Sequence, residues 1–172
     1  MKVIIVSGTP GTGKTTIAKK IAKEKKYEYI DVNKVIEKQN KKYNIISGFD
    51  KKRDSKIIDI DNLNNALIEL IKNKQNQEKN KEKKTKGLII DSHLAHYLPK
   101  EYVDLCIITK CDLKELKKRL EKRKYSKNKV RENLDAEIFD VCRIEALEKG
   151  HKVKIINTTY TTKETKKEKR KK

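Results

Sequence analysis

One short stretch constrains this chain more than any other: residues 8–16 read GTPGTGKTT. The spacing of Gly8, Gly13, Lys14 and Thr15 is the P-loop pattern. Glycines, including Gly11, let backbone amides approach an anion closely because no Cβ atom lies in the way. In such a loop the lysine reaches the β- and γ-phosphate oxygens, and the threonine hydroxyl binds Mg²⁺. The pattern therefore predicts a site for a nucleoside triphosphate.

The pattern is informative only between a strand and a helix, and both flanks are present. An apolar run at 3–6 precedes the loop, and apolar residues recur at helical spacing after it, at Ile17, Ala18, Ile21 and Ala22. The alternative is a chance glycine-rich turn with an ordinary surface lysine. In a chain of this length such a chance match has odds of roughly one in a hundred or below. Requiring a strand before it and a helix after it lowers the odds further. We therefore expect a loop that binds ATP at the positive end of a helix.

Length and charge indicate one domain that carries basic, low-complexity segments. The chain has 172 residues, of which 35% are hydrophobic, a low share for a single core. Much of the formal net charge of +20 lies in residues 72–86 and 163–172, which contain no apolar side chain. Such segments cannot offset the entropy of ordering, so we expect an insertion and a tail that are mobile. They are either solvated or attract a polyanion such as RNA without sequence specificity.

The cysteines and the apolar segments exclude several classes of protein. Cys106, Cys111 and Cys142 have neither CxxC spacing nor a neighbouring histidine, which favours buried or half-buried free thiols over a zinc or redox site. The apolar run after Lys2 is too short for a signal peptide, and no segment is long enough to span a bilayer. We expect a soluble cytoplasmic protein, or a nuclear one in a host with a nucleus.

Strand-like and helical patterns alternate along the chain. After the first strand, further strands are predicted at 27–31, 87–91, 102–110 and 151–159. Helices are predicted at 33–43, from Ile60 to Ile71, at 112–124 with Asp112 as N-cap, and over 131–149 up to Gly150, with a polar irregular region before Asp59. This order predicts an α/β domain with a parallel sheet and ligands at the carboxyl ends of its strands.

Two titratable residues follow the strand predicted at 87–91. Asp91 has the position of a Walker-B carboxylate, which holds Mg²⁺ directly or through water. His93 either orients a nucleophilic water or a substrate phosphate, or caps the next helix, and its position at a strand end favours the functional role. His96 has no comparable position, so we expect it to be structural.

Arginines near residues 119–131 could supply positive charge to a transferring phosphoryl group, because the fixed fork of donors on arginine suits phosphate oxygens. Arg119 and Arg123 are one helical turn apart. Arg131 lies near the end of the basic segment at 122–132. The alternative is a basic surface helix, which is common in a lysine-rich chain.

Several segments together resemble the adenylate kinase isoenzyme 6 family, small P-loop proteins of archaea and eukaryotes associated with small-subunit ribosome assembly. Residues 8–16 match its loop, and Asp91 with His93 match its Asp-x-His strand end. Its Arg-x-Leu-x-x-Arg helix and its Asn-x-x-x-Glu-Ile-Phe segment, the most diagnostic of these motifs, correspond to Arg119, Leu120, Arg123, Asn133, Glu137, Ile138 and Phe139. Lys124 departs from the family, which often has glycine there.

The resemblance implies the nucleoside-monophosphate-kinase fold, a five-stranded parallel sheet flanked by helices with a short lid. Residues 1–162 would form a single kinase domain, with a monophosphate-binding region at about 33–63, the basic insertion at 72–86 and the lid at about 122–132. A basic tail would follow at 163–172.

The P-loop pattern and the resemblance also imply a set of site residues. The catalytic residues would be Lys14, Asp91, His93 and Arg123, and Thr15 with Asp91 would bind the metal. The residues that bind the nucleotide would be Gly8, Gly11, Gly13, Lys14, Thr15, Thr16, Arg119, Arg123 and Tyr160.

The activity implied is that of a kinase that converts ATP and AMP into two ADP with Mg²⁺, together with ATPase activity in ribosome biogenesis. Implied partners are a ribosomal protein of the uS11 type and pre-ribosomal RNA, with no membrane. Two alternatives stay open. One is an ATPase switch that binds the ribosomal protein with little kinase activity, and the other is a kinase of another small metabolite.

Overall fold

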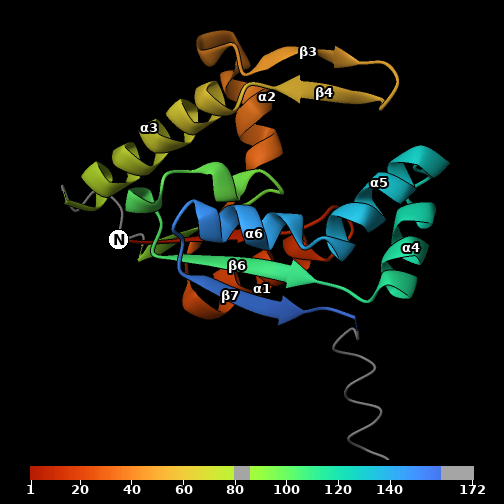
Figure 1. Cartoon of the computed structure of the whole chain (residues 1–172). Helices are drawn as coiled ribbons and strands as arrows, with labels where there is room; N and C mark the ends of the chain where they lie inside the picture. The colour runs from red at the N-terminus through yellow and green to blue at the C-terminus, as the bar shows by residue number, and fades with distance from the viewer. Residues whose placement is uncertain (80–85, 160–172) are drawn as a thin grey trace, which may run out of the picture.

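Five short strands form one parallel sheet in the computed structural model, which describes residues 1–79 and 86–159 (Figure 1). The strands lie in the order β2-β5-β1-β6-β7, and each neighbouring pair is parallel. Their bounds are β1 Lys2–Ser7, β2 Glu28–Asp31, β5 Gly87–Asp91, β6 Leu105–Lys110 and β7 Val153–Asn157. The predicted α/β fold with a five-stranded parallel sheet is confirmed.

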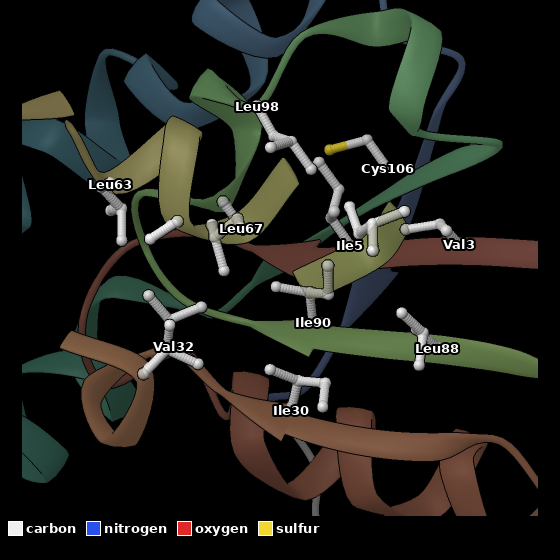
Figure 2. Packing of buried hydrophobic residues seen from close by; sticks show 14 of the residues in the cluster. Val3, Ile5, Ile30, Val32, Leu63, Leu67, Leu88, Ile90, Leu98 and Cys106 are labelled. Atoms are coloured by element: carbon white, nitrogen blue, oxygen red, sulfur yellow. The ribbon is translucent and has the colours of Figure 1, made fainter. Parts of the chain in front are cut away.

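Helices cover both faces of this sheet, because its central strands are apolar on both sides. In β1, Val3 and Ile5 pack into one hydrophobic cluster while Ile4 and Val6 pack into another. Figure 2 shows the first cluster, in which Leu67 of a covering helix lies above the sheet. Two separate layers of core therefore hold the carboxyl ends of the strands in place.

The helices divide between the two faces. The second cluster contains Ala18 and Ala22 of α1 (Lys14–Lys25), and the first receives side chains from α2, α3 and α6. The bounds are α2 Val32–Tyr43, α3 Ile60–Lys79, α4 Leu113–Lys122, α5 Lys127–Ile138 and α6 Val141–Glu148, with short 3₁₀ turns at Ala95–Tyr97 and Lys100–Tyr102. As expected, the Asp112 carboxylate caps α4 by accepting from the amides of Lys114 and Glu115.

The region expected to be irregular before Asp59 contains an antiparallel hairpin, so that prediction is wrong. Its strands are β3 Ile46–Asp50 and β4 Ser55–Ile58, and the hairpin projects away from the main sheet (Figure 1). Asp50 stabilises the turn, since its Oδ1 accepts from the amides of Lys52 at 2.9 Å and Arg53 at 3.0 Å. The pattern is weak in the sequence because Phe49 is exposed and Gly48 has no side chain to pack.

Two helices also end in places that the sequence did not indicate. Residues 72–79, expected to be mobile, continue α3, because extending an existing helix adds a hydrogen bond for each residue that becomes ordered. The single helix predicted over 131–149 is instead α5 and α6, separated at Asp140, which has a left-handed φ of 55°. The Asp140 carboxylate pairs with Lys110 at 2.9 Å and with Arg143, which stabilises this break.

Other expectations concern cysteines, histidine and membrane helices. Cys106 and Cys111 are buried free thiols and Cys142 is half-buried, as predicted. His96 is buried and hydrogen-bonded to Ser7 and Glu145, which agrees with a structural role.

Within residues 1–79 and 86–159, no helix has the length and apolar character to cross a membrane. Residues 80–85 of the predicted insertion, Tyr160 and the tail at 163–172 lie outside the described residues.

Candidate active site

The P-loop connects β1 to α1 and adopts a conformation that only glycine tolerates. Gly8 has a φ of 134°, and a Cβ atom there would lie 2.5 Å from the carbonyl oxygen of Thr109. Gly11 has a φ of 95°, and its Cβ would lie 2.8 Å from Cδ1 of Leu116. Gly13, with a φ of 84°, is the N-cap of α1. The glycines predicted from the sequence are thus required by positive φ and by close packing.

Lys14 folds back over this loop. Its Nζ donates to the carbonyl oxygens of Gly8 at 2.8 Å and Thr9 at 3.0 Å. Burial lowers the pKa of Lys14 from 10.5 to about 8, while Cys142 and Asp91 oppose that shift. A bound triphosphate would favour the charged ammonium, so the side chain is suited to exchange carbonyl partners for phosphate oxygens.

A cleft of about 320 Å³ opens in front of the loop, and we call it the P-loop cleft. It brings together most of the residues predicted from the sequence to bind or act on the nucleotide. Its lining includes Gly11, Gly13, Lys14, Thr15, Thr16, Asp91, His93 and Arg123. These residues come from three separate parts of the chain. The carboxyl ends of β1 and β5 place the loop, Asp91 and His93 at one edge of the sheet, whereas Arg123 lies at the end of α4.

Asp91 ends β5 beside two other strand ends. It lies opposite Val6 of β1 and Asp31 of β2 in the strand register. Its Oδ2 accepts from the Tyr29 hydroxyl at 2.8 Å, and burial together with this hydrogen bond raises the pKa of Tyr29 above its ordinary value. Asp91 is buried, so the bond fixes its orientation toward the cleft that it lines.

The donors in the P-loop cleft fit Mg²⁺, which prefers oxygen ligands and keeps phosphate and water ligands as well. The Thr15 hydroxyl and the Asp91 carboxylate both line the cleft and would hold the ion, and Asp31 adds a second carboxylate.

His93 also lines a second and larger cleft. This cleft has a volume of about 620 Å³ and lies between α2, the β3–β4 hairpin, α5 and α6, and we call it the hairpin cleft. Burial of the imidazole and, to a smaller extent, the nearby Lys14 ammonium lower the pKa of His93 below its ordinary value. The ring is therefore neutral at pH 7. The residues that line both clefts are Pro10, Asn33, Ser92, His93 and Tyr125.

The hairpin cleft is closed on one side by contacts between exposed side chains. Arg53 at the hairpin turn pairs with Glu132 of α5, with Nε and Oε1 3.3 Å apart. Lys129 donates its Nζ to the carbonyl oxygens of Arg53 at 3.2 Å and Asp54 at 3.1 Å. The first turns of α5 are therefore joined to the tip of the hairpin, as their approach in Figure 1 suggests.

Comparisons with known proteins agree with this geometry. The profile of the AAA domain family matches residues 4–140. A protein of Methanosarcina acetivorans named "Putative adenylate kinase" is 41% identical over 162 residues, 94% of this chain and 80% of that protein. A protein of the same name from Methanocaldococcus jannaschii is 35% identical over 154 residues, 90% of this chain and 77% of that protein. The chain belongs to the AAA domain family.

A solved structure supports the fold independently. The crystal structure named as a putative kinase from Chloroflexus aurantiacus matches with a TM-score of 0.54 and 17% identity, over 92% of this chain and 89% of that chain. Such a match shows the same P-loop kinase-like architecture. As a member of the AAA domain family with these relatives, the chain is a phosphotransferase of the P-loop class.

Not every predicted nucleotide ligand of this AAA domain protein lines the P-loop cleft. Arg119 pairs with Glu115 at 2.8 Å and donates to the carbonyl oxygens of Thr158 at 2.9 Å and Thr159 at 3.3 Å. It therefore holds the segment after β7, whereas Arg123, the C-cap of α4, lines the cleft. Gly8 lies behind the loop against Thr109. Arg131, the third arginine near the predicted lid, is exposed and lines neither cleft.

Sequence reasoning missed several residues that line the clefts. Asp31 ends a predicted strand, and this position, shared with Asp91, was the signal that could have identified it. Asn33 and Tyr125 carry no local pattern, because their place in the site depends on how α2 and the α4–α5 connection pack.

Proposed function

We propose that the chain is an ATP-dependent nucleoside monophosphate kinase that transfers the γ-phosphoryl group of ATP to AMP and yields two ADP. One observation carries the proposal: a P-loop cleft and a second cleft of substrate size share a wall that contains His93. A donor in the first cleft and an acceptor in the second would meet at that wall. Phosphoryl transfer consists largely of such positioning, together with stabilisation of charge.

The residues of the two clefts divide this work. Lys14 would hold the β- and γ-phosphates, and Arg123 adds a cation on the same side. When bound, Mg²⁺ would neutralise charge on the phosphates between Thr15 and Asp91. The neutral ring of His93 would orient the attacking oxygen of the acceptor at the shared wall.

The hairpin cleft has the mixed charge that a nucleotide acceptor requires. Arg53, Lys56 and Lys129 bring positive charge to one side of its lining, where an acceptor phosphate would be stabilised. Glu37 and Glu145 provide carboxylate oxygens that can accept hydrogen bonds from a base or a ribose.

The acceptor is tested by incubating the purified protein with ATP and Mg²⁺, alone or with AMP, CMP, UMP or dAMP. We expect ADP to accumulate rapidly only with AMP, and slow phosphate release without an acceptor. Phosphate release that no monophosphate changes would support the ATPase switch. Inactivity with every nucleotide acceptor would point to a kinase of another small metabolite.

A second candidate function is supported by an exposed apolar surface. In the Asn-x-x-x-Glu-Ile-Phe segment, Ile138 is 55% exposed and Phe139 is 69% exposed, immediately after the buried Glu137. Exposed apolar side chains that cluster mark interaction sites. We propose on this basis that the chain is a member of the adenylate kinase isoenzyme 6 family and docks a ribosomal protein of the uS11 type during small-subunit assembly, close to pre-ribosomal RNA.

Docking is tested by calorimetric titration of the uS11-type protein into the wild type and into Phe139→Ala. We expect the variant to bind the ribosomal protein at least about tenfold more weakly, as for an aromatic contact at an interface centre, while ATP affinity stays unchanged. Equal binding by both proteins would overturn this docking surface.

A further inference from the structure

Thr9, the second residue of the P-loop, organises the loop around its own backbone. Its carbonyl oxygen accepts from Lys14 Nζ at 3.0 Å, from the Thr12 amide at 3.2 Å and from the Thr12 hydroxyl at 2.8 Å. The side chain is 1% exposed, so its hydroxyl also needs a partner inside the protein. The orientation of Thr9 therefore affects where Lys14 lies.

That partner is Glu137, the last buried residue of α5. Its Oε2 accepts from the Thr9 hydroxyl at 2.6 Å, and its Oε1 accepts from the Cys111 amide at 3.0 Å. Lys110 provides a compensating cation, with its Nζ 3.5 Å from Oε1. Glu137 is 5% exposed, and burying a carboxylate is costly unless it is paired in this way.

The helix that carries Glu137 also forms a wall of the hairpin cleft. Asn133 and Ala136, both on α5, line that cleft, and Lys129 with Glu132 join the first turns of the helix to the hairpin. The Glu137–Thr9 bond is therefore a direct link between the acceptor side of the molecule and the P-loop. None of the P-loop chemistry described above requires a carboxylate at this place.

We propose that Glu137 is a positioning residue for triphosphate binding, and that it acts by holding Thr9 so that Lys14 faces the P-loop cleft. The Asn-x-x-x-Glu-Ile-Phe segment thereby gains a physical role: its buried carboxylate orders the loop that receives ATP. The inference rests on the nucleotide-binding half of the proposed function and needs no assumption about the acceptor.

Five variants and one control test this role through the affinity for ATP with Mg²⁺, measured calorimetrically at 25 °C. Glu137→Ala and Thr9→Val each remove the bond, and we expect each to weaken ATP binding about tenfold, the scale of a lost hydrogen bond to a charged group. The double variant should be no weaker than either single variant, because both remove the same contact.

Two conservative variants should retain the affinity within about threefold. Thr9→Ser keeps the hydroxyl, and Glu137→Gln can donate its amide to the Thr9 oxygen while its carbonyl accepts from Cys111. The matched control is Asp140→Asn, which removes the other carboxylate charge beside Lys110 near the same helix end without touching the loop. We expect this control to lose thermal stability but to bind ATP like the wild type.

The inference is overturned if Glu137→Ala and Thr9→Val bind ATP as tightly as the wild type, whatever their melting temperatures. It is equally overturned if Asp140→Asn weakens ATP binding as much as they do, because Glu137 would then serve only stability. Thr9→Val keeps the test valid if Glu137→Ala does not fold. A wild-type protein that binds no ATP would overturn the proposed function itself.

Discussion

The two clefts that share His93 are built in different ways. The P-loop cleft is shaped by backbone: glycines at positive φ, the amino end of α1 and buried strand ends at β1 and β5. The hairpin cleft is shaped by side chains from four elements, and exposed pairs such as Arg53–Glu132 join its walls. We therefore expect the first cleft to be preformed and the second to adjust, which suits the proposed acceptor site.

The largest loss of activity is expected when Lys14 of the P-loop cleft is replaced. Lys14→Ala should reduce turnover by about 10³-fold or more and severely weaken ATP binding, because no neighbour replaces its charge on the β- and γ-phosphates. Steady-state kinetics and calorimetric ATP titration provide the measurement. Lys20→Ala, on the exposed face of α1, is the control and should behave like the wild type. Normal turnover by Lys14→Ala would remove the P-loop cleft from the mechanism.

Asp91 should be the next most sensitive position. Asp91→Asn should lower Mg²⁺-dependent turnover by about 10²-fold to 10³-fold while the protein stays folded, since the substitution removes a charge and keeps the shape. Tyr29→Phe should have a smaller effect, because it keeps the charge of the carboxylate and removes only the hydrogen bond that orients it. Circular dichroism checks folding. An Asp91→Asn protein with full activity would contradict the metal role.

His93 lies on the wall that both clefts share, so its loss should affect rate more than binding. His93→Gly should lower kcat for transfer to AMP by about 10-fold to 100-fold and change ATP affinity by less than about threefold. His93→Gln, which retains a hydrogen-bonding group, should recover part of the rate. If binding and rate fell together, His93 would be a structural cap.

The pKa of Lys14 predicts how ATP binding depends on pH. In the free protein this pKa is lowered from 10.5 to about 8, whereas the bound phosphates favour the charged ammonium. ATP affinity should therefore be flat below about pH 8 and fall above it, by up to about tenfold per pH unit. Calorimetry at pH 9 in two buffers should show proton uptake on binding. Lys14→Arg stays charged and should lack this pH dependence.

The smallest effect is expected in the hairpin cleft. Arg53→Ala should change the KM for AMP by about twofold to fivefold and leave ATP affinity unchanged, because exposed ion pairs contribute little. Exchanging the charges with Arg53→Glu and Glu132→Arg should restore the KM. Lys117→Ala, from an exposed pair on α4, is the control. A loss of ATP affinity in Arg53→Ala would show that the clefts are not built as differently as proposed.

The same contrast explains what the sequence could predict. The P-loop and the Asp91–His93 strand end were predictable because their chemistry needs fixed residue types at short spacing, between runs with clear strand and helix periods. The continuous apolar run of β5, buried on both faces, likewise indicated a strand within a parallel sheet.

The hairpin cleft was not predictable, for physical reasons. In the hairpin the apolar side chains Phe49 and Ile57 are exposed, while Gly48 and Asp50 are half-buried. No alternation of apolar and polar residues therefore marks its strands. The break at Asp140 contains neither glycine nor proline and depends on Lys110, thirty residues away. Residues such as Asn33 enter the site only through tertiary packing. Where structure depends on long-range contacts, local pattern carries little information.

The central claim is that a phosphoryl group crosses from the P-loop cleft to an acceptor in the hairpin cleft. The most direct measurement follows the γ-phosphoryl group of radiolabelled ATP in the presence of Mg²⁺ and excess AMP. We predict that most of the label appears in ADP, and that His93→Gly slows its appearance. Label found entirely in inorganic phosphate, at a rate that AMP does not change, would contradict the account.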